Sequence, residues 1–254
     1  MADAGTPSRT PMIDVRDLRK RFYTPEPVDA VGGIGFECFA GEVFALLGPN
    51  GAGKTTALRM LATLLSPDAG TARLNGHEVS ERPAAVRASI GYLSTSTGLY
   101  KRLTAREMIR YFAVLQGVDA PEARTEELLD QLGIRDFQHQ RCDRLSTGMA
   151  QKVNIARAIV HRPPILILDE PTNGLDVLVA REFLEFIEQA RDDGYCILFS
   201  THIMSEVERL ADRVAIMNRG RILADDTLEG LRARTGARWL GDVFARLVEQ
   251  AEPA

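Results

Sequence analysis

The sequence lacks any long uninterrupted apolar segment, and this absence limits the functions it can have. No stretch approaches the roughly 18 apolar residues of a membrane-spanning helix, and Glu37 and Glu42 interrupt its most hydrophobic region, residues 30–48. The segment 1–11 lacks the apolar centre of a secretion signal and is predicted to be a disordered tail. We therefore expect a soluble, cytoplasmic chain that reaches a membrane only through a partner.

An excess of positive charge and a cysteine framework are also missing. Lysine and arginine total 31 against 35 aspartates and glutamates, a net charge of −4. This balance lacks the broad positive field of a nucleic-acid-binding protein, so no nucleic acid partner is expected. Cys38, Cys142 and Cys196 are far apart and in no metal-ligand spacing, which favours reduced thiols in a cytosol. A chain of 254 residues, 45% apolar, can bury a full core without disulfides.

Short β-type apolar runs alternate with amphipathic helical patterns, which predicts an α/β core with a mainly parallel sheet. Strands are expected at 43–48, 88–93, 165–169, 196–202 and 213–218, with an edge hairpin over 71–79. Helices are expected over 54–65, 121–133, 177–191 and 239–248. Residues 100–145 carry helical patterns only, beginning with a capping box of Thr104 and Glu107. This helical insertion predicts a subdomain within the α/β frame.

The strongest motif is GPNGAGKT, which follows a predicted strand and begins a predicted helix. Its glycines let successive backbone N–H groups point into one concavity, and the helix N-terminus adds partial positive charge. Lys54 is predicted to bridge the outer phosphates of a nucleotide, and the Thr55 hydroxyl to bind Mg²⁺. A glycine-rich turn without a ligand is the alternative that this context disfavours. The predicted nucleotide-binding residues are Gly48, Pro49, Asn50, Gly51, Ala52, Gly53, Lys54, Thr55 and Thr56.

Two carboxylates follow the apolar run ILIL. A strand that ends at Asp169 places this side chain at the sheet edge where the phosphate loop also lies. We expect Asp169 to hold Mg²⁺ through water molecules. Glu170 is predicted to act as the general base toward the attacking water. Two solvated carboxylates at a strand end are the alternative.

A second helix start is predicted at LSTGM, residues 145–149. Ser146 or Thr147 caps this helix, and Gly148 leaves backbone exposed near its N-terminus, which suits an anion. The start of an ordinary helix can have such a sequence, so the motif alone is weak evidence for anion binding. It becomes specific because the strand that ends in Asp169 and Glu170 follows it.

Together with NGLD at 173–176 and His202, these motifs resemble the nucleotide-binding subunit of an ABC transporter in order and spacing. The resemblance covers about residues 12–250. It implies a P-loop NTPase core with an N-terminal antiparallel β portion and a helical subdomain, the ABC ATPase cassette. It also implies an ATPase domain over 12–235, with the subdomain at about 100–160, followed by a C-terminal helix and tail over 236–254.

The resemblance implies that the chain hydrolyses ATP with Mg²⁺, with Lys54, Glu170 and His202 as catalytic residues. It implies a head-to-tail pair of cassettes, in which one chain closes over the ATP held by the other; a homodimer is expected, and a heterodimer is the alternative. The closing residues are Ser146, Thr147, Gly148 and Asp176. His202 resembles the histidine that contacts the γ-phosphate, although a strand-end histidine with a local hydrogen bond is the alternative. Phe22 stands where the family places an aromatic ring under adenine, and Tyr23 is an alternative.

The sequence departs from the family at two places. Thr147 and Met149 replace a glycine and the glutamine of the usual L-S-G-G-Q. Thr95 stands where a glutamine links the metal site to the membrane partner, after Ser94 in place of a proline. Thr95 is therefore predicted either to hold a Mg²⁺-bound water molecule or to be a solvated turn residue. The adjoining TGLYKRLTARE is similar to the ATP-binding subunits of NatA-type sodium exporters.

These resemblances imply an ATPase subunit that drives a separate transmembrane permease from the inner face of the membrane, with export favoured over import. One alternative is a soluble ABC ATPase of translation or DNA repair. Translation-type members generally carry two cassettes, and repair-type members need a long coiled coil before the LSTGM position; both are missing. The other alternative is an ATP-sensing regulatory module, which the presence of Glu170 and His202 disfavours.

Overall fold

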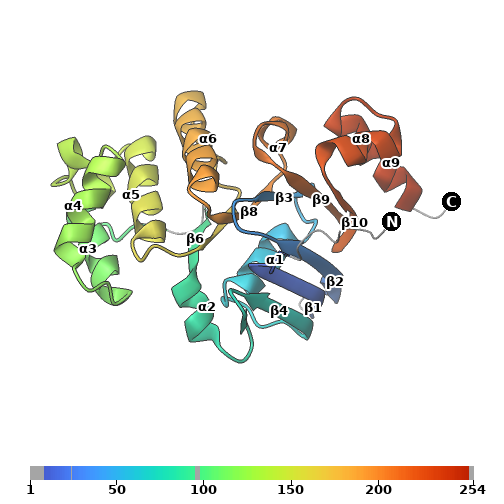
Figure 1. Cartoon of the computed structure of the whole chain (residues 1–254), viewed down its shortest axis with the longest axis horizontal. Helices are drawn as coiled ribbons and strands as arrows, with labels where there is room; N and C mark the ends of the chain where they lie inside the picture. The colour runs from blue at the N-terminus through green and yellow to red at the C-terminus, as the bar shows by residue number, and fades with distance from the viewer. Residues whose placement is uncertain (1–8, 24, 95–97, 252–254) are drawn as a thin grey trace, which may run out of the picture.

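The larger of two sheets forms the centre of the molecule (Figure 1). The computed structural model describes residues 9–23, 25–94 and 98–251. Over these residues the strand order of this sheet is β10-β9-β3-β8-β7-β6. Its strands are β3 (Val43–Leu47), β6 (Ile90–Ser94), β7 (Ile165–Asp169), β8 (Cys196–Thr201), β9 (Arg213–Asn218) and β10 (Arg221–Asp226). All neighbours pair in parallel except β9 and β10, which confirms the expected mainly parallel core.

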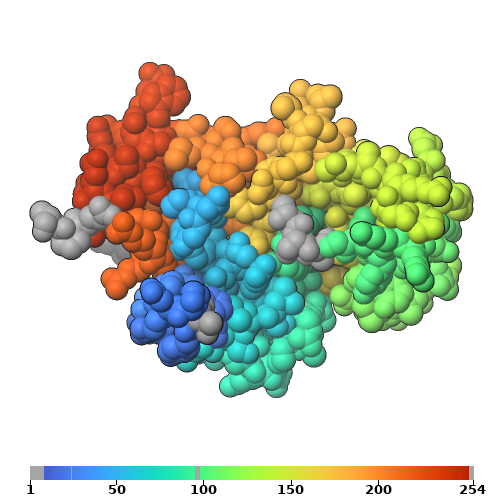
Figure 2. Space-filling view, turned by 180° about the vertical axis from the view of Figure 1, so that it is seen from behind, coloured from blue at the N-terminus to red at the C-terminus, as the bar shows by residue number. Residues whose placement is uncertain are grey.

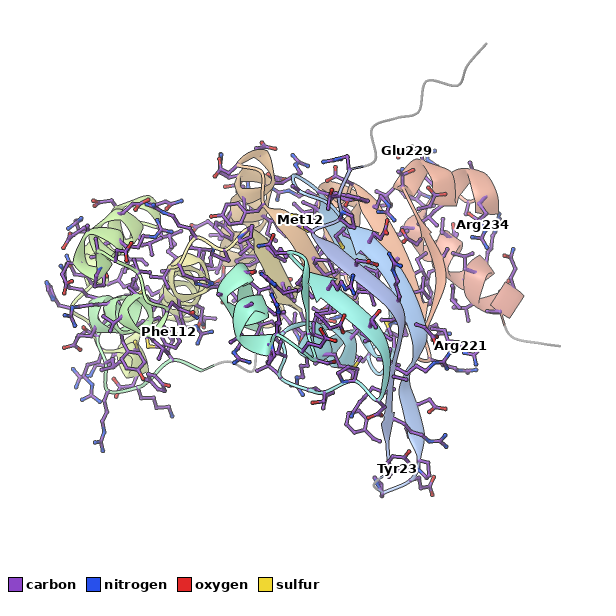
Figure 3. All side chains as sticks on the ribbon, turned by 60° about the horizontal axis from the view of Figure 1, so that its bottom comes forward. Met12, Tyr23, Phe112, Arg221, Glu229 and Arg234 are labelled. Carbon is purple, nitrogen blue, oxygen red and sulfur yellow. The ribbon has the colours of Figure 1, made fainter. Side chains whose placement is uncertain are left out.

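The smaller sheet is antiparallel and has the order β2-β1-β4-β5. Its strands are β1 (Ile13–Phe22), β2 (Val28–Cys38), β4 (Ala69–Leu74) and β5 (His77–Glu78). The expected hairpin joins β4 to β5 through Asn75 and Gly76, whose φ angles of 48° and 77° give the tight turn that such hairpins use. The ribbon of β1 and β2 extends from the body of the molecule to a tip at Tyr23 (Figure 3).

Strand β3 separates two hydrophobic clusters, and all five of its residues are buried. Val43, Ala45 and Leu47 contribute to the cluster on the side of the C-terminal helices. Phe44 and Leu46 contribute to the cluster that contains α1 (Lys54–Leu61) and the smaller sheet. Because the strand is buried on both faces, its sequence is continuously apolar rather than alternating. Helix α1 contacts strands of both sheets, so its N-terminal loop is held between them.

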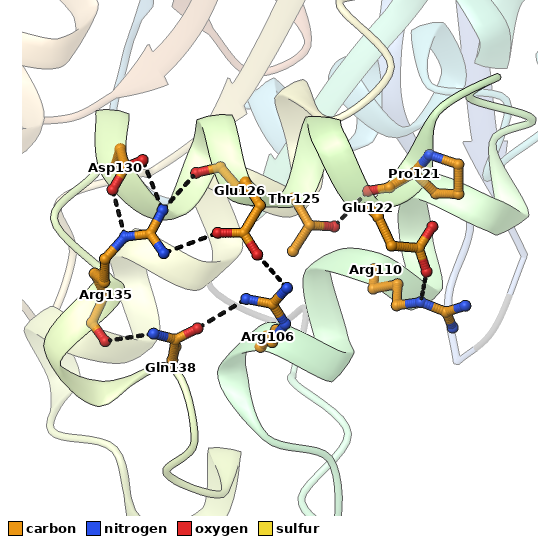
Figure 4. A network of polar contacts seen from close by, with 9 residues as sticks. All are labelled: Arg106, Arg110, Pro121, Glu122, Thr125, Glu126, Asp130, Arg135 and Gln138. Atoms are coloured by element: carbon orange, nitrogen blue, oxygen red, sulfur yellow. Dashed lines mark hydrogen bonds and ion pairs between the residues drawn. The ribbon is translucent and has the colours of Figure 1, made fainter.

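A separate group of helices lies beyond β6, at the left of Figure 1. It contains α3 (Ala105–Leu115), α4 (Pro121–Gln131) and α5 (Thr147–Ile159), and Thr104 and Glu107 form the predicted capping box. The carboxylate of Glu126 accepts hydrogen bonds from Arg106 and Arg135, which tie α4 to α3 and to the following turn (Figure 4). Each of these ion pairs is partly exposed and stabilises little alone, but together they fix how the two helices pack.

The remaining helices cover the sheets. They are α2 (Pro83–Ser89), α6 (Val177–Asp192), α7 (Met204–Leu210), α8 (Leu228–Thr235) and α9 (Leu240–Ala251). On α9, Leu240, Val243 and Leu247 are buried, as the apolar stripe predicts, whereas Trp239 is 60% exposed. Across the described ranges, no helix is both long enough and apolar enough for a membrane span.

Several predicted boundaries differ from the structure, and two of them have a clear local reason. The strand expected over 88–93 begins only at Ile90, because residues 88 and 89 end helix α2. Pro83 occupies the first turn of this helix, where a missing N–H has no cost. The helix expected to reach residue 65 ends at Leu61, and Thr63 has a left-handed φ of 60° that no helix continues through.

Arg124 provides a test of how the helical group is held together. Its guanidinium is buried and donates hydrogen bonds to the carbonyls of Ile159 and Val160 at 2.7 and 2.9 Å, at the C-terminus of α5. Arg124→Leu should lower the free energy of unfolding by about 1–3 kcal/mol, because buried carbonyls lose their donors. Chemical denaturation measures this change. Arg110→Leu, which breaks only an exposed pair with Glu122, should cost much less, and equal losses would contradict the assignment.

Candidate functional site

The loop between β3 and α1 can be built only with glycine at two of its positions. Gly53 has a φ of 102°, and a Cβ atom there would lie 2.1 Å from the carbonyl oxygen of Ala30. A Cβ atom on Gly48 would lie 2.2 Å from the carbonyl oxygen of Met217. The backbone is therefore pressed against both sheets, which fixes the direction of the N–H groups at the start of α1.

Lys54, the first residue of α1, is buried with 4% of its surface exposed. Its ammonium donates hydrogen bonds to the carbonyls of Gly48 and Pro49 at 2.7 and 3.2 Å. The Nζ atom also lies 3.0 Å from Oε1 of Glu170. A buried ammonium needs such partners, and phosphate oxygens are acceptors of the same kind.

The predicted metal ligands Thr55 and Asp169 lie together. The Oδ1 atom of Asp169 accepts hydrogen bonds from the Thr55 hydroxyl at 2.9 Å and from the Ser200 hydroxyl at 2.8 Å. Oxygen ligands of this kind suit Mg²⁺, which binds one or two protein groups together with water and substrate phosphates. Within the described ranges, no group of three or more histidine, cysteine or acidic side chains is placed to hold a metal ion. Thr95, the third predicted ligand, lies outside the described residues.

The carboxylate of Asp169 also affects Tyr92 on the neighbouring strand β6. Burial, and then the negative charge of Asp169, raise the pKa of Tyr92 on β6 above its ordinary value. The Tyr92 phenol therefore stays neutral beside the carboxylate at physiological pH.

Glu170 and His202, two of the predicted catalytic residues, lie in direct contact. The Oε2 atom of Glu170 lies 2.7 Å from Nδ1 of His202. Glu170 has a left-handed φ of 50°, a conformation that costs a non-glycine residue free energy and is often found at functional sites. The Ser200 carbonyl and hydroxyl oxygens both accept from the Glu170 N–H at 3.1 Å and hold it there. One carboxylate thus contacts both Lys54 and His202.

Lys54, Thr55 and Glu170 line a pocket of about 480 Å³, whereas Asp169 and His202 are not among its lining residues. In the space-filling view the light-blue surface near residue 50 adjoins the amber surface near residue 170 (Figure 2). The lining consists of Val28, Asp29, Ala30, Asn50, Gly51, Ala52, Gly53, Lys54, Thr55, Thr56, Glu170 and Arg219. Of the predicted loop residues, Gly48 and Pro49 are not among the lining residues, and their carbonyls accept hydrogen bonds from Lys54.

Several predicted site residues do not line this pocket. Phe22 pairs with Val28 at the end of β1 and is 41% exposed, and Tyr23 is 72% exposed at the ribbon tip (Figure 3). Ser146, rather than Thr147, caps α5 by accepting from the Met149 N–H at 3.3 Å.

Gly148 and Asp176, the other two residues expected to close over a nucleotide, lie at the starts of α5 and α6. A Cβ atom added at Gly148 would lie 2.8 Å from the side chain of Val179 on α6. Asp176 caps α6 by accepting from the N–H groups of Leu178 and Val179, each at 3.0 Å. Within one chain these residues therefore do not surround the phosphate loop.

Sequence reasoning missed the pocket residues Val28, Asp29 and Ala30 on β2, and also Ser200 and Arg219. Ser200 is fully buried in an apolar strand and links Asp169 to Glu170. Its only sequence signal is a hydroxyl in the run CILFSTH, on a strand that parallel pairing places beside β7. Arg219 lies in the turn between β9 and β10, far along the chain from every motif, and no local pattern marks it.

Comparisons with known proteins find chains of similar sequence and a solved structure of similar fold. A family model described as ABC transporter matches residues 31–173. The chain is 43% identical over 237 residues to ABC transporter ATP-binding protein NatA of Bacillus subtilis (strain 168), covering 92% of this chain and 96% of NatA. It is 35% identical to linearmycin resistance ATP-binding protein LnrL of the same organism, covering 93% and 74% of the two chains. A solved ATP binding subunit of an ABC transporter superposes with a TM-score of 0.83 at 32% identity, covering 93% of this chain and 99% of that one.

Ser200→Ala tests the role of the buried hydroxyl in positioning the two carboxylates. We expect ATP turnover to fall about tenfold or more, in line with the 1.5–3 kcal/mol of a hydrogen bond to a charged group. Half-maximal activity should also need more Mg²⁺, because Asp169 loses a donor that orients it. Steady-state kinetics at varied Mg²⁺ measures both effects.

A matched control is Thr235→Ala, which removes another buried hydroxyl that donates to a carbonyl, in α8. It should leave the Mg²⁺ dependence unchanged. An unchanged Mg²⁺ dependence in Ser200→Ala would mean that Ser200 is structural only.

Proposed function

The chain belongs to the ABC transporter family, and from this premise we propose that the pocket between α1 and β7 is its site of ATP hydrolysis. The protein is an ATP-binding and ATP-hydrolysing subunit. The observation that carries the site proposal is the single carboxylate of Glu170, which contacts both Lys54 and His202 beside the Thr55–Asp169 pair. All of the catalytic residues expected from the sequence meet there.

The residues have separate tasks in this proposal. The N–H groups of the loop 48–56 and the ammonium of Lys54 bind the phosphates and orient the γ-phosphate. Glu170 lies next to Lys54, so a water molecule between Glu170 and that phosphate can pass its proton to the carboxylate. His202 holds the Glu170 carboxylate through Nδ1, and its other ring nitrogen would contact the γ-phosphate.

Mg²⁺ is the metal that the oxygen ligands Thr55 and Asp169 fit. When bound, this ion would neutralise part of the negative charge of the phosphates. The Ser200 hydroxyl keeps Asp169 aimed at Thr55. Thr95 remains a proposed contributor through a metal-bound water molecule, with the solvated turn as its alternative.

A second copy of the chain is the proposed partner that completes the site. Ser146, Thr147, Gly148 and Asp176 are absent from the described lining of their own phosphate pocket, as expected if they act on the partner's nucleotide. Directly after Asp176, Val177 and Leu178 are 84% and 73% exposed. Two neighbouring exposed aliphatic side chains favour a contact that covers them.

A transmembrane permease is the other proposed partner. The chain, bound to this permease at the cytoplasmic face of the membrane, would supply it with the free energy of ATP hydrolysis. Export is the proposed direction, because the relative LnrL is described as a linearmycin resistance ATP-binding protein. We also propose an ATPase domain over 12–235 with its helical subdomain at about 100–160, and a C-terminal segment over 236–254.

Glu170→Gln tests the proposed base. Hydrolysis should slow by about 100-fold or more, because the amide cannot accept the proton from water. ATP should still bind, and MgATP should trap a dimer that size-exclusion chromatography resolves from the monomer. Lys54→Ala, as a control, should lose ATP binding and show no trapped dimer. Fast hydrolysis by Glu170→Gln would overturn the assignment, and a monomer with ATP bound would contradict the dimer.

The double variant Val177→Glu and Leu178→Glu tests the surface next to Asp176. The ATP-dependent dimer should be lost and turnover should fall at least tenfold, because carboxylates would be buried against the second copy. Nucleotide affinity of the monomer should change little. Val114→Glu, at a residue 53% exposed on α3, is the matched control and should dimerise normally. If the double variant still forms the ATP-dependent dimer, Val177 and Leu178 do not lie in the dimer interface.

A further inference from the structure

Glu206, on α7, is a buried glutamate that has no task in the proposed reaction, and only 6% of its surface is exposed. Its two carboxylate oxygens accept hydrogen bonds from distant parts of the chain. Oε1 accepts from the hydroxyl of Thr172, and Oε2 accepts from the hydroxyl of Thr201 at 2.7 Å. Removing a carboxylate from water costs free energy that such donors must offset. The two threonines therefore hold Glu206 in a fixed position, and Glu206 holds them.

The two threonines are close in sequence to two proposed catalytic residues. Thr172 lies two residues after Glu170, in the turn that follows β7. Thr201 is the last residue of β8 and directly precedes His202. Glu206 thus joins the turn that carries Glu170 to the strand end that carries His202.

The hydroxyl of Thr201 has a defined direction. Its oxygen accepts from the N–H of Ile203 at 3.0 Å, and its proton points to Glu206. The contact with Ile203 spans His202 and shapes the bend through which the chain passes from β8 to α7. A carboxylate only accepts hydrogen bonds, so Glu206 orients the protons of both threonine hydroxyls toward itself. The position of the His202 backbone therefore depends on Glu206 through one hydroxyl.

We propose that Glu206 is a positioning residue for ATP hydrolysis, which keeps Glu170 and His202 in contact by fixing the backbone segments that carry them. Oε2 of Glu170 and Nδ1 of His202 lie 2.7 Å apart, and a shift of about 1 Å would break such a hydrogen bond. Glu206 is not among the residues that line the phosphate pocket. The inference rests on the proposed ATP site and adds a residue that acts through two of its catalytic groups.

Steady-state ATP hydrolysis by the full chain and by Glu206→Ala is the first test. The kcat should fall about 10- to 100-fold, as expected when catalytic groups are slightly displaced. The KM for ATP should change little, because β2 and β9 enclose the phosphate loop. Glu206→Gln keeps the shape of the side chain and one acceptor oxygen, so it should recover part of the lost kcat. Glu42→Ala removes another glutamate with 6% exposure, which pairs with Arg213 outside the pocket lining, and should keep both constants.

A second variant tests the same link if Glu206→Ala does not fold. Thr172→Val removes one of the two donors to Glu206 and nearly conserves the volume of the side chain. Its kcat should fall while its KM for ATP stays unchanged.

A second measurement does not depend on activity. The chain has four histidines, so NMR spectra of the imidazole nitrogens in the nucleotide-free protein contain few signals, and His202→Gln identifies the signal of His202. Glu170→Gln should change this signal, because Nδ1 loses its carboxylate partner. Glu206→Ala should produce a similar change, Glu206→Gln a smaller one and Glu42→Ala none. The signals of the other histidines should stay in place in every variant.

An unchanged His202 signal or an unchanged kcat in Glu206→Ala would overturn the inference. A raised KM for ATP with kcat retained would also reject it, because Glu206 would then act on nucleotide binding rather than on the catalytic pair. If Glu170→Gln hydrolyses ATP as fast as the unmodified chain, the proposed site itself fails. That result is distinct from a failure of Glu206 alone, in which Glu170→Gln is still slow.

Discussion

The contact between Lys54 and Glu170 is the interaction around which the site is arranged. It joins the start of α1 to the end of β7, two elements far apart in the chain, through charges that are largely removed from water. A buried ion pair of this kind contributes little net stability, because desolvation offsets the attraction. The ion pair instead positions Glu170. Its carboxylate is held between the Lys54 ammonium, which suits phosphate, and the His202 imidazole.

That arrangement depends on how tightly the loop before α1 is enclosed. Carbonyl oxygens of Met217 on β9 and Ala30 on β2 approach Gly48 and Gly53 so closely that a Cβ atom at either position would clash. The smaller sheet therefore shapes the loop on one side and the larger sheet on the other. Substitutions at these glycines should damage folding and nucleotide binding together, which makes them poor probes of chemistry. Ser200 and Glu170 are better probes, since their side chains can change without moving the loop.

Local patterns in the sequence predicted much of this fold. The phosphate loop, the buried strands and the capping box of Thr104 are encoded by short segments, and the structure forms each of them. Contacts between distant segments were not predictable in the same way. Ser200 becomes a partner of Asp169 only through the pairing of β7 with β8, and Arg219 reaches the pocket only because a turn packs against β2. The predicted start of a strand at residue 88 was wrong, because a short apolar run after Pro83 is compatible with either a helix or a strand.

The distribution of polar groups over the surface links the site to the proposed assembly. Lys54, Thr55 and Glu170 converge on one pocket, whereas Ser146 and Asp176 start two helices, α5 and α6, outside that pocket. Helix N-termini present unpaired N–H groups and partial positive charge, which are stabilised by a phosphate more than by water alone. In the proposed assembly, a single chain would carry both halves of a phosphate site without joining them. In a symmetric pair each half would then meet the complementary half of the other copy, so that one interface would complete two sites at once. Hydrolysis would then require that two copies of the chain associate. The free energy of nucleotide binding would be available to move the proposed permease to which the pair is attached.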